Sequence, residues 1–224
     1  MKLYSGPLSM FGAKAEIAAH EKGLAFELVM VPFEMKTLYQ PKHPEVLRIN
    51  PKRQVPVLID GDLEIFDSTQ IFEYLESIKP EPALWPAEPK ARARARLLEH
   101  KSDEVYFPPI VRLMGLQATP DDAAAVEARA AALAFYDDME KAMSGKEWLA
   151  GSYSYADIAF YMAQIFGDRM GAPMTDAHPK LKVWRDRMSA RPPVRQVAGA
   201  MGRYLLSEGR KLPAFLAAIS TPSP

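Results

Sequence analysis

The sequence predicts an α+β protein in which a small domain containing all the strands is followed by an all-helical domain. Every convincing strand lies before residue 67, and from about residue 88 the chain becomes Ala-rich and helical in pattern. Prolines at 80, 82 and 86 favour a stiff, extended connection between these two parts. A chain of 224 residues is long enough for two modest domains. We therefore expect domains at 1–79 and 88–224, joined by a linker at 80–87.

The first domain is expected to begin with a strand, a helix and a second strand. Lys2-Leu3-Tyr4 reads as a short strand, and a helix should run from about residue 10 to residue 21, with Gly23 closing it. In residues 26–31, one set of side chains (Phe26, Leu28 and Met30) alternates with another (Glu27, Val29 and Val31), which we interpret as a second strand. Residues 34–49 are polar and contain two prolines, so they predict a loop with a short irregular helix.

A hairpin is predicted over residues 56–66, where two apolar runs flank Asp60-Gly61. Asp-Gly is a strong hairpin signal because both central positions of a type I′ turn need positive φ. Pro56 cannot donate a ladder hydrogen bond, so it belongs at a strand's start or edge. It also pushes Val55 into extended geometry and leaves the N–H and C=O of Val55 free to face outward. With a helix over 68–78, the order predicts a small mixed sheet with helices on both faces.

The second part of the chain is predicted to be helical throughout. Pro108-Pro109 must bend or interrupt the first helix, because each proline removes an intrahelical donor. Ser154 and Asp157 have the spacing of a capping box, which we interpret as a folding device that opens a buried helix. The predicted helices span about 88–116, 121–144, 155–170, 179–190 and 194–206, with a short last helix over 212–219 and a frayed end from 221.

Composition excludes several classes of function. The chain has 28 basic and 28 acidic residues, and this neutral balance argues against nucleic acid or an anionic membrane surface as the main partner. No apolar run is long enough to span a membrane and no signal sequence is evident, so we expect a soluble cytoplasmic protein. There is no cysteine, which excludes disulfides and protein thiols, and the four histidines lack ligand spacing, so no metal is expected.

Motifs in both parts of the chain, taken in order, resemble the cytosolic glutathione transferase family, and specifically its serine-type, theta- or zeta-like bacterial members. In the first part they are Leu3-Tyr4, Pro7-Leu8-Ser9, Lys14, Asn50-Pro51, Val55-Pro56-Val57-Leu58, Asp67-Ser68, Ile71 and Tyr74-Leu75. In the second part they are Leu149-Ala150-Gly151, Ser154-Tyr155-Ala156-Asp157-Ile158, Pro179, Leu181, Trp184 and Arg191-Pro192. The resemblance implies a thioredoxin-like first domain that binds glutathione and an all-helical second domain.

The resemblance also implies how the peptide backbone of glutathione would be held. Next to a proline, Val55 can pair its N–H and C=O with the cysteinyl peptide as an added strand. The family's proline at this place is cis, so we predict a cis Val55–Pro56 bond, although only about 5% of X–Pro bonds are cis.

Asp67 and Ser68 open the helix that the resemblance assigns to the γ-glutamyl end of glutathione. Asp67-x-x-Gln70 fits a capping box, and free N–H groups, the helix dipole and the Ser68 hydroxyl would hold the carboxylate while Asp67 takes the ammonium. Asp67 replaces the more frequent Glu. Gln54 aligns with a residue that meets the glycyl end, and Arg53, which replaces a glycine, and Lys42 would attend the glycyl carboxylate.

Ser9 is the predicted catalytic residue. As an N-cap it would be worth about 1 kcal/mol to its helix, and in serine-type members a serine at this place donates to the glutathione sulfur. The alternative activator, Tyr4, lies inside the first predicted strand and reads as a core residue. Glu16 stands where many relatives carry a basic residue, which should reduce the positive potential near the helix start.

The electrophile is expected to bind in an apolar pocket between the two domains. Methionine and aromatic side chains give an adaptable lining. The candidates are Met10, Phe11, Tyr106, Phe107 and Met114.

We therefore predict a homodimeric glutathione S-transferase that uses glutathione as co-substrate and a hydrophobic electrophile as substrate. Absence of cysteine separates it from the thiol-reducing branches of the family. Two alternatives stay open: cleavage of an aryl ether or dehalogenation by the same thiolate, and a non-catalytic binding or regulatory protein that keeps the fold.

Overall fold

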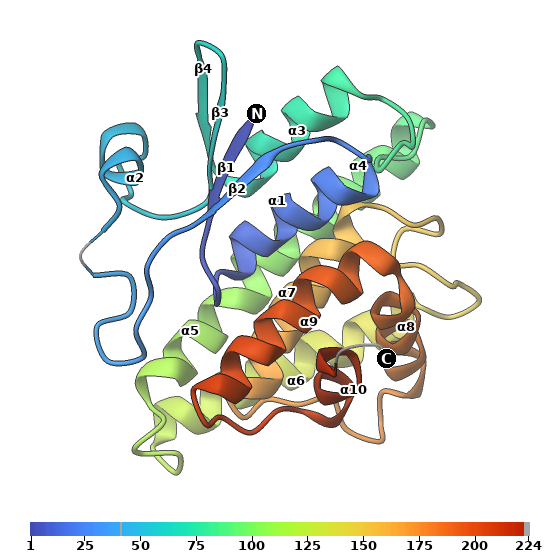
Figure 1. Cartoon of the computed structure of the whole chain (residues 1–224). Coiled ribbons are helices and arrows are strands. Elements are labelled where there is room, and N and C mark those ends of the chain that lie inside the picture. The colour runs from blue at the N-terminus through green and yellow to red at the C-terminus, as the bar shows by residue number, and fades with distance from the viewer. Residues whose placement is uncertain (41, 222–224) are drawn as a thin grey trace. The chain divides into compact units, whose positions relative to one another are not determined.

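The computed structural model describes residues 1–40 and 42–221 (Figure 1). Contacts within the chain divide it into two compact units, the first made of Met1–Ala83 and Pro192–Pro224 and the second of Leu84–Arg191. The end of the chain therefore groups with the strands, whereas the sequence assigned all of 88–224 to one helical domain. The predicted division into domains at 1–79 and 88–224, with a linker at 80–87, stays a prediction.

The strands of the first unit form one four-stranded mixed sheet in the order β2-β1-β3-β4. β2 runs parallel to β1, while β3 is antiparallel to both of its neighbours. All four strands lie where the sequence predicted them. Their bounds are Lys2–Ser5 for β1, Glu27–Met30 for β2, Val57–Asp60 for β3 and Leu63–Phe66 for β4.

Helices cover both faces of this sheet. α1 (Met10–Glu21) and α3 (Ser68–Ile78) pack Ala15 and Ile71 against Leu3 of the sheet. On the opposite face, the short α2 (Pro44–Ile49) buries Val46 beside the strand residues Tyr4 and Val57. A mixed sheet with helices on both faces and this strand order is the thioredoxin-like arrangement that was predicted.

The hairpin forms at the predicted place but with a different turn. Asp60 pairs with Leu63, so the two loop residues are Gly61 and Asp62. Of these only Gly61 has positive φ, at 64°. This is the pattern of a type II′ turn, whose first central position requires positive φ, and the predicted type I′ turn centred on Asp60-Gly61 was wrong.

Two helices from the end of the chain complete the first unit. α9 (Pro192–Ser207) lies along α1, and α10 (Ala214–Ser220) packs on α9 (Figure 1). Tyr204 of α9 donates its hydroxyl to the backbone carbonyl of Phe33 at 3.1 Å. The predicted frayed end falls mostly on residues 222–224, which lie outside the described part of the chain.

The second unit is helical, as predicted. Its first predicted helix is divided into α4, a π-helical turn (η1) and α5, and Pro108 and Pro109 follow directly after the π-turn, inside the first turn of α5. Within the described residues, no helix is long and apolar enough to cross a membrane. The bounds are Pro89–Lys101 for α4, Ser102–Tyr106 for η1, Phe107–Gly115 for α5, Ala123–Ala142 for α6, Tyr155–Arg169 for α7 and Pro179–Ala190 for α8.

Asp157, in the first turn of α7, organises the centre of the second unit. Its carboxylate accepts hydrogen bonds from the Ser154 backbone at 2.9 Å, from the Leu149 backbone at 3.0 Å and from the Trp184 indole at 2.9 Å. The predicted capping box is confirmed. Burial raises the pKa of Asp157 to about 6, while these donors act in the opposite direction.

Candidate functional site

The register of the sheet brings three segments of the predicted site to one end of the first unit. Tyr4 at the end of β1 pairs with Val57 at the start of β3, and Val57 pairs with Phe66 at the end of β4. The chain therefore leaves β1 toward Ser9, enters β3 from Val55 and leaves β4 toward Ser68, all at the same end of the sheet. The N-termini of α1 and α3 lie there too, and neither has an acidic residue in its first turn.

Ser9 is the N-cap of α1. Its Oγ accepts the backbone N–H of Gly12 at 2.9 Å, and its residue is 8% exposed, so the hydroxyl sits at the rim of the helix end. In the described part of the chain no acceptor is recorded for the Ser9 O–H. The hydroxyl proton can therefore be donated to a ligand while the oxygen continues to cap the helix.

Tyr4, the alternative activator, is a core residue. It is 6% exposed and packs with Val31, Val46 and Val57, and its ring lies 5.1 Å from the His43 ring. This is the placement that the sequence predicted for it.

The loop before β3 presents the backbone of Val55. The Val55–Pro56 bond is cis, which confirms the prediction. The Asn50 side chain holds this loop: its amide donates to the Gln54 carbonyl at 2.6 Å and its oxygen accepts the Lys52 N–H at 2.9 Å. Among the described residues no backbone partner is recorded for the Val55 N–H and C=O, so both can pair with an extended peptide.

The start of α3 is built as a capped helix end. Asp67 has a φ of 77°, and its carboxylate accepts the N–H groups of Thr69 at 3.0 Å and Gln70 at 3.2 Å. Ser68 is buried at 3% exposure, whereas Asp67 itself is exposed. A left-handed backbone at a non-glycine residue is costly and is found preferentially at functional sites.

The residues predicted for the glycyl end are accessible. Arg53, with a φ of 56°, and Gln54 are exposed in the loop before Val55, and Lys42 is half-buried just before α2. No contact ties these three side chains to one another in the described part of the chain, so their roles stay predictions.

Charged groups inside α1 set the electrostatics behind Ser9. Lys14 is 1% exposed, with its ammonium 5.3 Å from the centre of the Phe11 ring. Glu16 is 5% exposed, and desolvation raises its pKa to about 7. Because a carboxyl with this pKa is only partly ionised at neutral pH, Glu16 lowers the positive potential less than an ordinary glutamate would.

The residues predicted to line an electrophile pocket divide between the two units. Met10 is buried and Phe11 half-buried in α1, whereas the other three lie in the second unit. There Tyr106 is fully buried and bonded through its hydroxyl to Tyr136, which is the placement of a core residue. Phe107 stacks on Phe166 at 5.2 Å, and Met114 is 43% exposed. A shared pocket stays a prediction.

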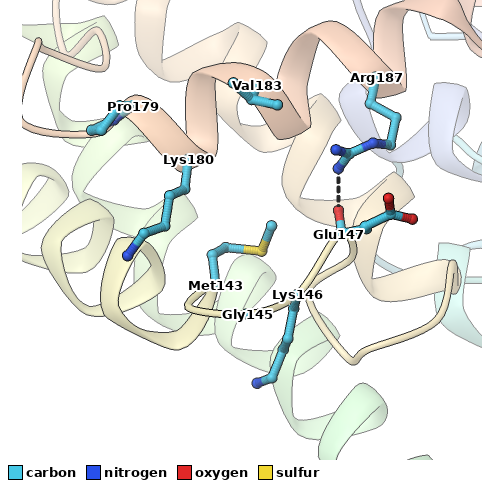
Figure 2. Close-up of a pocket in the computed structure, with 8 residues that line it drawn as sticks. All are labelled: Met143, Gly145, Lys146, Glu147, Pro179, Lys180, Val183 and Arg187. Atoms are coloured by element: carbon cyan, nitrogen blue, oxygen red, sulfur yellow. Dashed lines mark hydrogen bonds between the residues drawn. The ribbon is translucent and has the colours of Figure 1, made fainter.

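A hollow of about 490 Å³ lies elsewhere in the second unit, between the end of α6 and α8 (Figure 2). Arg187 closes one side by donating to the Glu147 carbonyl. None of the predicted site residues lines it. Its lining residues are Met143, Gly145, Lys146, Glu147, Pro179, Lys180, Val183 and Arg187.

Three residues that sequence reasoning missed shape the site end of the first unit. Asn50 fixes the Val55 loop, as described above. The Tyr39 hydroxyl accepts the Leu8 N–H at 3.2 Å, and a Cβ built on Gly6 would lie 2.3 Å from the Tyr39 ring, so this ring covers the loop before Ser9. The signal for the role of Asn50 in the sequence is an asparagine before a proline in a predicted loop.

The fold defines a class of protein with a thioredoxin-like sheet in its first half and a helical second half. Residues 3–83 match the glutathione S-transferase N-terminal domain, and residues 103–192 match the C-terminal domain of the same family. A probable glutathione S-transferase of Oryza sativa subsp. japonica is 30% identical over 212 residues, which cover 90% of this chain and 97% of that protein. The chain belongs to the glutathione S-transferase family.

Two further similarities extend this result. The crystal structure of a glutathione S-transferase from Rhodospirillum rubrum F11 superposes with a TM-score of 0.78 at 27% identity, covering 98% of this chain and 99% of that one. A stringent starvation protein A homologue of Coxiella burnetii is 35% identical over 109 residues, and this match spans 48% of each chain.

Proposed function

We propose that this protein is a glutathione transferase of the serine type, theta- or zeta-like in its choice of activating residue. The observation that carries the proposal is the meeting of Ser9, the cis-proline loop at Val55 and the start of α3 at one end of the sheet. Val55 offers an extended backbone to the cysteinyl peptide, and the α3 N-terminus with Ser68 offers donors to the γ-glutamyl carboxylate. Asp67 takes the ammonium, and Arg53, Gln54 and Lys42 attend the glycyl end.

Ser9 stabilises the thiolate of glutathione. Its hydroxyl donates to the sulfur while its oxygen caps α1, and the helix dipole adds to the effect. Lowering a thiol pKa from about 8.5 to about 6.5 raises the thiolate fraction at pH 7 from about 3% to about 75%, a differential stabilisation of about 2.7 kcal/mol. One charged hydrogen bond and a helix end are sufficient for this effect.

The reaction is a nucleophilic displacement or addition at an electrophilic carbon. The thiol proton leaves to solvent, and the sulfur pair forms the new S–C bond. In a displacement the bond from carbon to the leaving group breaks, and the leaving group departs with that electron pair. Aryl-ether cleavage and dehalogenation are two cases of the same step. The protein supplies position and thiolate stabilisation, and we propose that it works as a homodimer.

A second candidate is a binding or regulatory protein that keeps the fold without turnover. The observation that favours it is the half-length similarity to a stringent starvation protein A homologue, a protein whose name is not that of a transferase. Turnover of 1-chloro-2,4-dinitrobenzene separates the two candidates, because only the enzyme consumes it.

The sharper test measures the thiol pKa of bound glutathione by ultraviolet absorbance of the thiolate. Ser9→Gly removes the hydroxyl but costs a helix N-cap only a few tenths of a kcal/mol, so the fold is kept. We expect the thiol pKa to rise by about two units in Ser9→Gly and to stay low in Ser9→Thr, which restores a hydroxyl. An unchanged thiol pKa in Ser9→Gly would leave Ser9 as a helix cap only.

A further inference from the structure

Ser5, the last residue of β1, carries a hydroxyl that the fold leaves unsatisfied. Ser5 is 1% exposed, and its Oγ has no hydrogen-bond partner among residues 1–40 and 42–221. Its backbone carbonyl, by contrast, accepts the Val31 N–H at 2.8 Å. Burying a hydroxyl without a partner costs about 1–3 kcal/mol, so such a group calls for a reason.

The unpaired hydroxyl lies beside the start of α1. A Cβ built on Gly12 would lie 2.1 Å from the Ser5 Oγ and 3.0 Å from the Ser9 Oγ, so the two hydroxyl oxygens are at most about 5 Å apart. The absent side chain of Gly12 is what allows both serines to approach the same point of the helix. Ser9 uses one lone pair of its oxygen for the Gly12 N–H and has a second lone pair left.

We infer that Ser5 is a positioning residue for Ser9. The Ser5 hydroxyl donates to the Ser9 oxygen when Ser9 in turn donates to an anionic sulfur. The inference rests on the proposed function. In the structure the two oxygens are not hydrogen-bonded, and a change of the Ser5 χ1 rotamer moves its oxygen across part of the gap while Ser9 keeps its bond to the Gly12 N–H. Hydrogen bonds of this kind often tighten only when the charge of the substrate is in place.

The chemical effect of Ser5 is to make Ser9 a stronger donor. A hydroxyl that accepts two hydrogen bonds is polarised, and the bond that it donates becomes stronger, by about 10–30% per added bond. The hydrogen bond from Ser5 also limits the directions in which the Ser9 proton can point, because both lone pairs of the Ser9 oxygen are then occupied. Ser5 acts through Ser9 and not on the sulfur itself, since its side chain is only 1% exposed.

Ser5→Ala separates this role from a structural one. If the hydroxyl only fills space, its removal leaves the bound thiol unchanged. Ser102 provides a matched control, because its Oγ is likewise unpartnered among the described residues and the residue is 0% exposed, but it lies in the second unit. In both variants, loss of an unsatisfied buried hydroxyl should keep or raise the melting temperature of the ligand-free protein.

The experiment measures the pKa of the glutathione thiol on the full-length protein, with Ser5→Gly as a second variant in case Ser5→Ala folds poorly. We expect Ser5→Ala to raise the thiol pKa by about half a unit, against about two units for Ser9→Gly, and Ser102→Ala to leave it unchanged. A thiol pKa in Ser5→Ala and Ser5→Gly equal to that of the parent, with Ser9→Gly still shifted, overturns the Ser5 inference alone. A parent protein that leaves the thiol pKa at its free value overturns the proposed function as well.

Discussion

The ammonium of Lys22 lies 2.6 Å from the Glu76 carboxylate, although the Lys22 side chain has no exposed surface. Its two other protons go to the backbone carbonyls of Lys79, at 2.7 Å, and Pro82, at 3.0 Å. One buried cation therefore ties the end of α1 to the end of α3 and to the segment that follows it. A buried lysine is tolerated because all three of its donors are used.

The first prediction concerns this cation. Lys22→Met keeps the length of the side chain but removes the ammonium that Glu76 and two carbonyls contact, and we expect a loss of about 2–4 kcal/mol of unfolding free energy in urea. Glu76→Gln retains an acceptor for Lys22 and should cost less than half as much. Equal losses in the two variants would show that the carbonyl contacts contribute little.

The second prediction concerns the close approach at Gly12. Gly12→Ala places a methyl group against the Ser5 and Ser9 oxygens, and the Ser5 Cβ would still lie 3.1 Å from it if the Ser5 hydroxyl rotated away. We expect a loss of at least about 2 kcal/mol of stability and weaker retention on immobilised glutathione. Gly115→Ala is the control, because a methyl group there meets nothing within 4 Å, and a gain of up to about 1 kcal/mol is expected from helix propensity.

The third prediction is a pH dependence carried by Glu16. Its pKa in the folded protein, about 7, is above the ordinary value of 4.5, so the folded state binds more protons between these pH values. Stability from this group is therefore present below about pH 4.5 and is lost as the pH rises through 7, by about 3 kcal/mol at most. Glu16→Gln should abolish this loss and raise the melting temperature at pH 8.

The neighbours of Glu16 define the control. His20 faces it across one helical turn, with its Nε2 4.0 Å from the Glu16 carboxylate, and the Gln196 side-chain amide of α9 lies 3.2 Å from the same Nε2. Burial lowers the pKa of His20, so this residue weakens stability on the acid side instead. His20→Gln should change the melting temperature below about pH 6.5 and leave the slope between pH 6.5 and 8 intact. A parent protein with a flat profile over that range would contradict the Glu16 prediction.

Local patterns in the sequence predicted the elements well, because the signals for them are local. The capping box at Asp157, the hairpin and the helices over 155–170 and 179–190 all follow from spacing and turn residues within a few positions. The cis bond at Val55–Pro56 came from family resemblance, since no local pattern specifies a cis isomer.

What the sequence did not predict depends on partners far away in the chain. Helical periodicity identifies an apolar face of α9 but does not say that it packs on α1, some 180 residues earlier. The same holds for Ser5: a serine at the end of a strand is ordinary in sequence, and only its burial beside Gly12 leaves its hydroxyl unpaired.

The last prediction concerns the core of the second unit, where Gly167 of α7 makes room for an aromatic pair. A methyl group on Gly167 would lie 1.9 Å from the Tyr106 hydroxyl oxygen and 3.0 Å from the ring carbon that bears it. The Tyr106 hydroxyl is bonded to Tyr136, which in turn donates to the Ala172 carbonyl at 3.1 Å. Gly167→Ala should therefore push Tyr106 away from its partner and cost about 2–4 kcal/mol.

Tyr106→Phe tests whether that hydroxyl is the source of the clash. Alone, this variant should cost only about 1 kcal/mol, because Tyr136 keeps its bond to Ala172. Combined with Gly167→Ala, it removes the atom nearest the new methyl group, so the double variant should lose less stability than the sum of the two single losses by at least about 1 kcal/mol. The measurement is a double-mutant cycle of urea unfolding free energies. Strict additivity would place the strain of Gly167→Ala in the helix backbone instead of at Tyr106.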